Sequence, residues 1–207
     1  MTVRDGTVLN RGTGECPDNV KHVVNLNGQT VLPGLGDAHI HISDVGWGME
    51  VLDLHSSRSS SQFLTLLASY INSSGWKKIS NSVNCLEALG WWEEHELPTR
   101  EEIDKILPDK PALFHRRCLH IIYMNSAAIA ALGLNDDNYE TELNVDVVRD
   151  NNGQATGILR EGFNLVRNSP LKHCTIETQK RYILNGLAAC VNAGLTQVHA
   201  CEGRGPP

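Results

Sequence analysis

The segment from residue 175 to residue 200 constrains the fold most strongly. Thr175 is a helix-capping residue type, and apolar side chains then recur at helical spacing, at Leu184, Leu187, Ala188 and Val191. Gly194 ends this pattern, and residues 195–200 have the composition of a strand. A helix, a short loop and an apolar strand in succession are typical of α/β folds. The segment therefore predicts an α/β chain.

Shorter patterns predict the other helices and strands. Thr99 and Glu102 have the spacing of a capping box, in which each side chain binds the backbone of the other residue. Asn27-Gly28 between apolar residues favours a hairpin turn. Residues 77–98 show no clear period. The expected elements are a hairpin at 23–32, a buried strand at 38–42, an amphipathic helix within 56–76, a short helix after Thr99, strand-like stretches in 113–124, a helix at 127–132 and a second hairpin at 145–159.

Charge and hydropathy exclude several classes of protein. The 207 residues carry 18 basic and 24 acidic side chains, a net charge of −6, whereas a protein that tracks nucleic-acid phosphates needs a basic surface. No apolar run approaches the ~20 residues of a membrane span, and the first residues lack the apolar core of a secretory signal. The six cysteines include no Cys-x-x-Cys pair. We therefore expect a cytoplasmic protein with free thiols, and neither nucleic acid nor membrane as its partner.

His39 and His41 form the pattern with the most chemistry. On a strand, residues two apart point to the same face, with Cα atoms about 6.5–7 Å apart. Two neutral imidazoles at that spacing can bind one metal ion. A chain with 9 histidines among 207 residues has roughly 0.4 such pairs by chance, so the pair alone is a weak motif. A metal site and a chance pair both remain open at this point.

Residues 31–41, V-L-P-G-L-G-D-A-H-I-H, resemble the first barrel strand of the amidohydrolase superfamily, which has a P-G-x-x-D-x-H-x-H signature. Further segments resemble one branch, the amidohydrolase family 3 proteins of YtcJ type. The order and spacing of these segments hold from about residue 20 to residue 202. The matching segments are 97–104, 108–111, His120 with Asn125-Ser126, 149–153, 157–161 and 193–199.

The resemblance implies a TIM-like (β/α) barrel beside a small β-sandwich. Residues 1–32 would supply part of the β-sandwich, and residues 33–207 the first part of the barrel, with an insertion at about 50–160. A closed barrel of this type takes about 250 residues. We therefore expect an incomplete barrel, which implies a fragment or a truncated gene product.

The resemblance also implies an activity, namely metal-dependent hydrolysis of carbon–nitrogen bonds other than peptide bonds, with substrates of the amide or formamide type. His39 and His41 would be the first ligands of a divalent metal, expected to be zinc. A metal-bound water of lowered pKa would attack the substrate carbonyl. In relatives, a lysine, two more histidines and an aspartate that acts as general acid and base lie further along the chain. No general acid or base is therefore assigned here.

Four other residues are candidates for a substrate pocket: His120, Asn125, Glu161 and His199. Each has a structural alternative, such as a packed histidine for His120, a helix N-cap for Asn125 or a charge at the start of a helix for Glu161. We interpret the remaining histidines as surface or structural residues, namely His22, His55, His95, His115 and His173.

Two functions follow from these patterns. In the first, the chain is the amino-terminal portion of a metal-dependent hydrolase with a small-molecule amide substrate. In the second, it is a non-catalytic fragment that acts as a protein-binding or regulatory partner. It would bind the missing half of the barrel or a full-length homologue, or form a homo-oligomer, through its exposed barrel edge. An open half-barrel exposes strand edges and apolar helix faces, and these surfaces would carry such an association.

Overall fold

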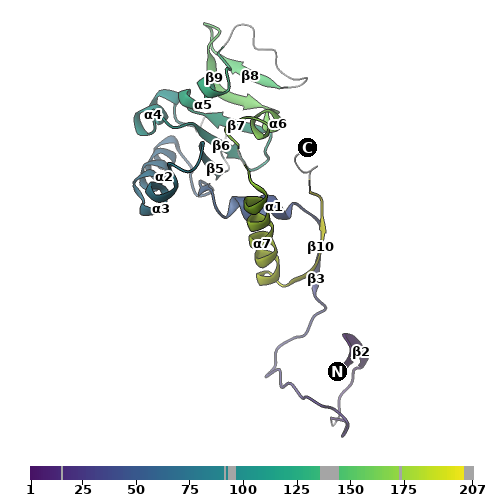
Figure 1. The fold of residues 1–207 in the computed structure, drawn as a ribbon. Coiled ribbons are helices and arrows are strands. Elements are labelled where there is room, and N and C mark those ends of the chain that lie inside the picture. Colours follow the sequence, from purple (N-terminus) through teal and green to yellow (C-terminus); the bar gives the residue numbers. More distant parts are fainter. Residues whose placement is uncertain (15, 91, 93–96, 136–144, 173, 203–207) are drawn as a thin grey trace. The chain divides into compact units, whose positions relative to one another are not determined.

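A computed structural model describes residues 1–14, 16–90, 92, 97–135, 145–172 and 174–202. The chain divides into two compact units, residues 1–34 and residues 35–207 (Figure 1). His95 and His173 lie outside the described residues. None of the described helices is long and apolar enough to cross a membrane.

The described residues of the first unit form one short hairpin. Strands β1 (Thr2–Arg4) and β2 (Thr7–Asn10) pair antiparallel across Asp5-Gly6, whose φ angles of 51° and 76° fit the tight hairpin turn that Asp-Gly favours. Asn27-Gly28 also forms the predicted turn, with φ angles of 47° and 83°. The expected strands on either side of it, at 23–32, are not formed, so this prediction is wrong apart from the turn. Val23 and Val24 are exposed, so these residues offer no buried apolar face to stabilise the pairing of two strands.

The second unit contains a six-stranded mixed sheet in the order β4-β5-β6-β7-β9-β8 (Figure 1). The neighbours β4, β5 and β6 are parallel, and the other pairs are antiparallel. The stretches expected in 113–124 and the second hairpin are confirmed as strands of this sheet. The strands are β4 (Leu52–Asp53), β5 (Leu86–Gly90), β6 (Ala112–Arg116), β7 (Ile121–Met124), β8 (Asp146–Arg149) and β9 (Ala155–Arg160).

Sequence patterns did not indicate β5, although it lies inside the sheet. Its residues alternate between fully and partly buried positions, and Leu86 and Ala88 have no exposed surface. Glu87 lies between them, and one charged residue in so short a strand is enough to obscure the apolar pattern by which strands are recognised.

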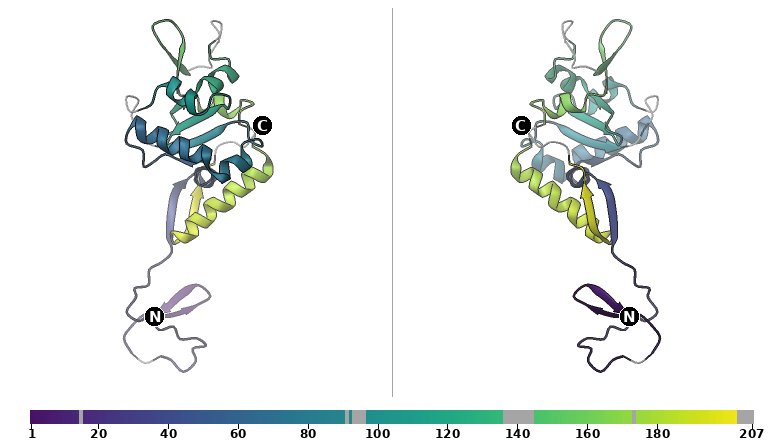
Figure 2. Two further views of the ribbon diagram at one scale, coloured as in Figure 1. Left: turned by 90° about the vertical axis from the view of Figure 1, so that its left-hand side faces the viewer. Right: turned by 90° about the vertical axis from the view of Figure 1, so that its right-hand side faces the viewer.

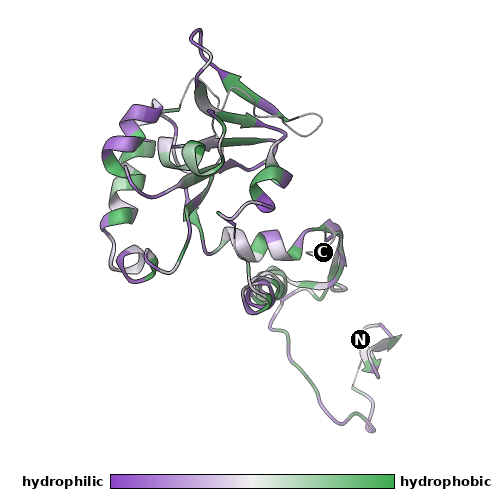
Figure 3. Cartoon of the chain, turned by 45° about the horizontal axis from the view of Figure 1, so that its top comes forward, coloured by the Kyte–Doolittle hydropathy of each residue, from purple (hydrophilic) through white to green (hydrophobic). Residues whose placement is uncertain are grey.

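Helices cover both faces of the sheet, as the views of Figure 2 show, and each face has its own core. Neighbouring residues on β6 point to opposite faces, so Phe114 packs with Phe63 and Leu67, whereas Leu113 packs with Ile129. Apolar residues accordingly run through the central strands (Figure 3). The helices of this part are α2 (Ser60–Asn72), α3 (Ser74–Ile79), α4 (Arg100–Ile106), α5 (Ser126–Ala131) and α6 (Phe163–Arg167). The helices predicted within 56–76, after Thr99 and at 127–132 are confirmed as α2, α4 and α5.

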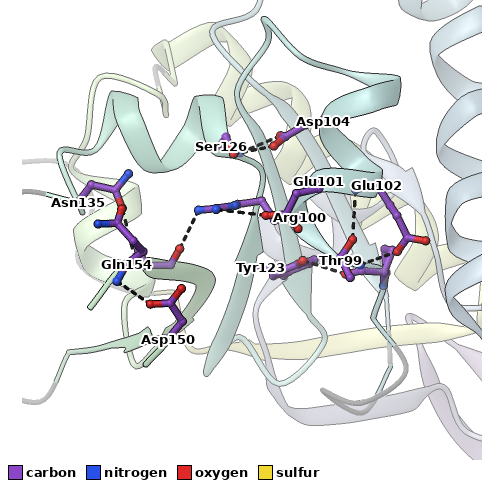
Figure 4. A network of polar contacts seen from close by, with 12 residues as sticks. Thr99, Arg100, Glu101, Glu102, Asp104, Tyr123, Ser126, Asn135, Asp150 and Gln154 are labelled. Carbon is purple, nitrogen blue, oxygen red and sulfur yellow. Dashed lines mark hydrogen bonds and ion pairs between the residues drawn. The ribbon is translucent and has the colours of Figure 1, made fainter. Parts of the chain in front are cut away.

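Polar contacts fix α4 on the sheet (Figure 4). The predicted capping box is present, because Glu102 N donates to Thr99 Oγ1 at 3.3 Å and Thr99 N donates to Glu102 Oε2 at 2.8 Å. Arg100 Nη1 donates to the carbonyl of Ala155 on β9 at 2.8 Å. Asp104 accepts from the hydroxyl of Ser126, on α5, at 2.6 Å. These bonds hold α4, β9 and α5 together.

The segment around His39 is built from two strands and two helices. Strands β3 (Leu35–Ile40) and β10 (Leu195–Ala200) pair in parallel, and they are joined to α1 (Ile42–Gly48) and α7 (Ile176–Asn192). The strand expected at 38–42 is thus present, but it ends at Ile40 and most of its residues are exposed rather than buried. The described residues form a mixed α/β fold without a closed barrel.

Helix α7 and its N-cap Thr175 are confirmed, but the expected apolar face is not buried. Leu184 and Val191 are 65% and 70% exposed. The helix instead packs against α1 at Gly186, which lies against Ile42. Gly46 of α1 and Gly186 of α7 permit this close approach, because a Cβ on either would lie 1.8 Å or 2.2 Å from a backbone oxygen of the other helix.

Candidate functional site

The structure places His39 and His41 side by side at the end of β3. His39 belongs to the strand, whereas His41 is the N-cap residue of α1, so the pair spans a strand-to-helix junction rather than one strand. The ring centres are 5.4 Å apart and the rings are nearly perpendicular, at 83°. Two imidazoles on one tetrahedral zinc ion have centres roughly 5 Å apart, because each Zn–N bond is about 2.0–2.1 Å long. The observed separation fits a shared metal ion.

Both imidazoles are exposed, and neither takes part in a hydrogen bond with the described residues. The backbone at this point is fixed, since His39 N donates to Asp37 Oδ1 at 2.9 Å and Val45 N donates to His41 O at 3.0 Å. Asp44 lies near His41, where burial raises the pKa of its carboxyl and His41 opposes that shift. The ring nitrogens are therefore available to a ligand while the backbone that carries them is held.

Two ligands do not make a complete catalytic zinc site, which uses three protein ligands and a water. Within the described ranges, no three histidine, cysteine, aspartate or glutamate side chains are arranged to hold a metal. The residues present thus fit two positions of a metal site.

Glu202 contacts the same junction from the end of β10. Its Oε1 accepts from Ile42 N at 2.6 Å and from Ser43 N at 3.2 Å, and its Oε2 accepts from the Ser43 hydroxyl. No sequence pattern indicated this contact, because 160 residues separate Glu202 from Ile42.

Two of the predicted pocket residues, His120 and Glu161, meet at the ends of neighbouring strands. Strands β7 and β9 pair antiparallel, which brings His120 Nδ1 to 2.9 Å from Glu161 Oε2. Glu161 N also donates to His120 O at 2.8 Å. Leu119 and Glu161 both have positive φ angles, 61° and 57°, so the backbone on either side is held in a conformation that non-glycine residues rarely adopt. Both side chains remain more than half exposed.

Asn125 occupies a different environment. Its side chain is fully buried, accepts from Ala112 N and Ala128 N, and donates to the carbonyls of Leu107 and Lys110, all at 2.9–3.0 Å. It is the N-cap of α5, as in the structural alternative above. Every hydrogen-bonding group of the amide is thus used within the protein, and none remains for a small molecule.

His199 lies near the end of β10, on the strand that pairs with β3. Its ring is exposed, and its Nε2 is 3.2 Å from the side-chain nitrogen of Gln197. The structure therefore brings His199 onto the same two-stranded sheet as His39.

A buried charged cluster, not predicted from the sequence, joins the six-stranded sheet to α1. The Glu87 carboxylate accepts a hydrogen bond from Trp47 Nε1 at 3.1 Å and forms an ion pair with Lys172 at 2.6 Å. It also lies 3.3 Å from His115 Nε2. Burial opposes ionisation of Glu87, but His115 and Lys172 outweigh it and lower the pKa to about 2. Burial lowers the pKa of His115, and its contact with Glu87 opposes that shift. Of the two positions expected for His115, surface or structural, the structure has the buried one.

A shallow cavity of about 350 Å³ lies elsewhere, beside α4 and β9. Arg100, Tyr123 and Asp150 are among its lining residues (Figure 4). None of the site residues predicted from the sequence lines it. In its wall, Arg100 pairs with Glu101 and donates to the Ala155 carbonyl.

Comparison with known proteins gives a consistent result. Residues 22–207 match the model of a family described as "Amidohydrolase family". The chain is 30% identical to the YtcJ protein of Bacillus subtilis (strain 168) over 213 aligned residues, covering 96% of this chain and 38% of that protein. It is 26% identical to the N-substituted formamide deformylase of Arthrobacter pascens, covering 67% of this chain and 26% of that protein.

A solved structure shows the same fold over part of its length. A metal-dependent hydrolase of Pyrococcus horikoshii OT3, itself uncharacterized, superposes with a TM-score of 0.52 and 22% identity. The match covers 80% of this chain and 30% of that one. The chain thus spans well under half the length of the proteins that it resembles.

Proposed function

The chain belongs to the amidohydrolase family, and we propose that it carries the first metal-binding segment of a hydrolase that cleaves carbon–nitrogen bonds other than peptide bonds. The main support for this proposal is the 5.4 Å separation of the His39 and His41 rings at the carboxyl end of β3. In (β/α) barrels, catalytic groups lie at the carboxyl ends of the strands.

The residues of the chain fit a divalent metal, which we propose to be zinc. When bound, such an ion polarises a carbonyl and lowers the pKa of a coordinated water. His39 and His41 would hold it through the lone pairs of neutral imidazoles, which are available near pH 7. With two ligands from the described residues, full occupancy of a catalytic site needs at least one more protein ligand.

We propose a small amide or formamide as the substrate. The name of the Arthrobacter relative, an N-substituted formamide deformylase, supports this class. Among the residues predicted to line a pocket, His120, Glu161 and His199 are exposed and can offer polar groups to a small molecule. Asn125 is buried and acts as a helix cap instead.

The test combines metal content with turnover. The chain is stripped with a chelator, reloaded with zinc, and assayed for bound metal and for hydrolysis of N-formyl amines. The double variant His39→Ala/His41→Ala should lose the metal, whereas His22→Ala, which removes an exposed histidine from the first unit, should retain it. Equal metal content in the double variant and the parent chain would contradict the assignment.

A second candidate function is association with a protein partner, and one observation favours it. Helix α7 exposes Ile176, Leu184 and Val191 to 68%, 65% and 70%. Large apolar side chains gathered on one helix usually mark a contact surface. In this alternative the chain is inactive and pairs with another copy of itself or with the remainder of a barrel. Light scattering should then show a dimer that Leu184→Glu dissociates, while a monomeric parent chain would exclude self-association.

A further inference from the structure

The residue at the N-cap position of α1 makes no capping hydrogen bond with its side chain. A helix leaves its first N–H groups without intrahelical partners, and an N-cap serine, threonine, aspartate or asparagine normally accepts from one of them. The N-cap here is His41, whose side chain makes no such bond. The imidazole is therefore not used for capping.

The missing acceptor comes from Glu202, which is remote in the sequence. One carboxylate oxygen accepts hydrogen bonds from Ile42 N, at 2.6 Å, and from Ser43 N, at 3.2 Å. The other oxygen accepts a hydrogen bond from the Ser43 hydroxyl. A carboxylate at this position is also favoured by the positive end of the helix dipole. Glu202 thus supplies both the hydrogen bonds and the charge that a capping residue would provide.

The pairing of β10 with β3 brings Glu202 to this point. Cys201 N donates to Ile40 O at 2.8 Å, which extends the parallel pairing one residue past the end of β10. The next residue is Glu202, and the residue after Ile40 is His41. The two strand ends therefore deliver the carboxylate and the imidazole to one junction.

We propose that Glu202 is a positioning residue for metal binding by His41. Its carboxylate satisfies the start of α1, so the His41 ring is left free and is held 5.4 Å from the His39 ring. Residues that orient metal ligands from outside the coordination shell typically change metal affinity 10–100-fold when removed. This inference rests on the proposed metal site and assigns a further residue to it.

The test measures binding of cobalt(II) alone, by competition with a chelator and by the absorption spectrum of the bound ion. Glu202→Ala removes all three hydrogen bonds and should weaken binding about 10–100-fold. Glu202→Gln retains an acceptor oxygen for Ile42 N and Ser43 N, so it should restore affinity to within a few-fold of the parent chain. The matched control is Glu177→Ala, which removes an exposed carboxylate of α7 and should leave binding unchanged.

Two results would overturn the inference. Unchanged affinity in Glu202→Ala would show that the contact does not matter to the metal. Equal loss in Glu202→Gln and Glu202→Ala would show that Glu202 acts as a charged ligand rather than as a cap. If Glu202→Ala does not fold, Ser43→Ala replaces it: loss of one of the three bonds should weaken binding a few-fold, and unchanged binding overturns the inference.

The proposed function is tested separately in the same assay. If the parent chain binds cobalt and His39→Ala/His41→Ala binds it equally well, the metal site itself is wrong. If the histidine variant loses the metal while Glu202→Ala binds normally, the site stands and only the role of Glu202 fails.

Discussion

Trp47 donates its indole N–H to the buried carboxylate of Glu87 over 3.1 Å, and this bond connects α1 to strand β5. The Trp47 ring also packs edge-on against His115, with ring centres 5.1 Å apart, and Lys172 Nζ lies 4.3 Å from the Trp47 ring centre. Since His41 is the N-cap residue of α1, the connection ties the candidate metal site to the core of the sheet.

Trp47→Phe tests this connection. The substitution keeps an aromatic ring but removes the hydrogen bond to a buried charge, so it should lower the free energy of unfolding by about 1.5–3 kcal/mol. Urea denaturation followed by circular dichroism gives this value. The control is Trp92→Phe, because Trp92 Nε1 is buried and has no hydrogen-bond partner among the residues that the structure describes. Equal effects of the two substitutions would contradict the prediction.

Glu87→Gln should change the response to acid. The pKa of Glu87 is about 2 in the folded chain against 4.5 for a free glutamate, so the carboxylate stabilises the fold fully above about pH 4.5. That contribution is lost as the pH falls from 4.5 towards 2. The variant should therefore be less stable than the parent at pH 7, and the two stability curves should converge in acid. Unfolding free energies measured from pH 7 to pH 2 provide the test, and parallel curves would contradict it.

Asn125→Ala should be strongly destabilising. The substitution leaves two buried N–H groups and two carbonyls without their partner and removes the cap of α5. We expect a loss of about 2–4 kcal/mol in the free energy of unfolding. Asn135→Ala is the matched control, since within the described part of the chain its exposed side chain accepts one long hydrogen bond, 3.4 Å from Ala155 N, and its loss should cost under about 1 kcal/mol.

Glu161 should prefer glycine to alanine. With φ at 57°, a Cβ at this position is strained, so Glu161→Gly should be about 1 kcal/mol more stable than Glu161→Ala. Both substitutions remove the exposed ion pair with His120, so its loss does not affect the difference in stability between them. The same two substitutions at Glu177, in the first turn of α7, should show the opposite order of stability. Glycine destabilises a helix by about 0.5–1 kcal/mol relative to alanine. Thermal melts of the four variants suffice.

Local patterns predicted the elements that local forces determine. The capping box at Thr99, the cap at Thr175 and the hairpin around Asp150–Gly153 all depend on residues a few positions apart, and all are present. The Asp5-Gly6 turn between β1 and β2 carries an equally strong local signal, but our predictions did not use it.

Elements that depend on distant partners were missed. Strand β5 contains Glu87, whose burial makes sense only beside Lys172, 85 residues away. The apolar face of α7 predicted from spacing is the exposed one, because glycine at position 186 lets the opposite side approach α1.

For the candidate site, the pattern identified His39 and His41 but placed both on a strand. At the observed junction, Ile42 N donates to Glu202, which lies 160 residues away in the sequence. His120 and Glu161 were selected separately, and only the register of β7 against β9 shows that they form a pair.

The close approach of Gly46 to Tyr182 has a mechanical consequence. Helix α1 has seven residues and is roughly 10 Å long, with Gly46 near one end and the N-cap His41 at the other. A methyl group on Gly46 would lie 1.8 Å from the Tyr182 carbonyl oxygen, so a larger residue there would force α1 and α7 apart. The helix that follows His41 can thus lie this close to α7 only while position 46 carries a hydrogen atom in place of a side chain.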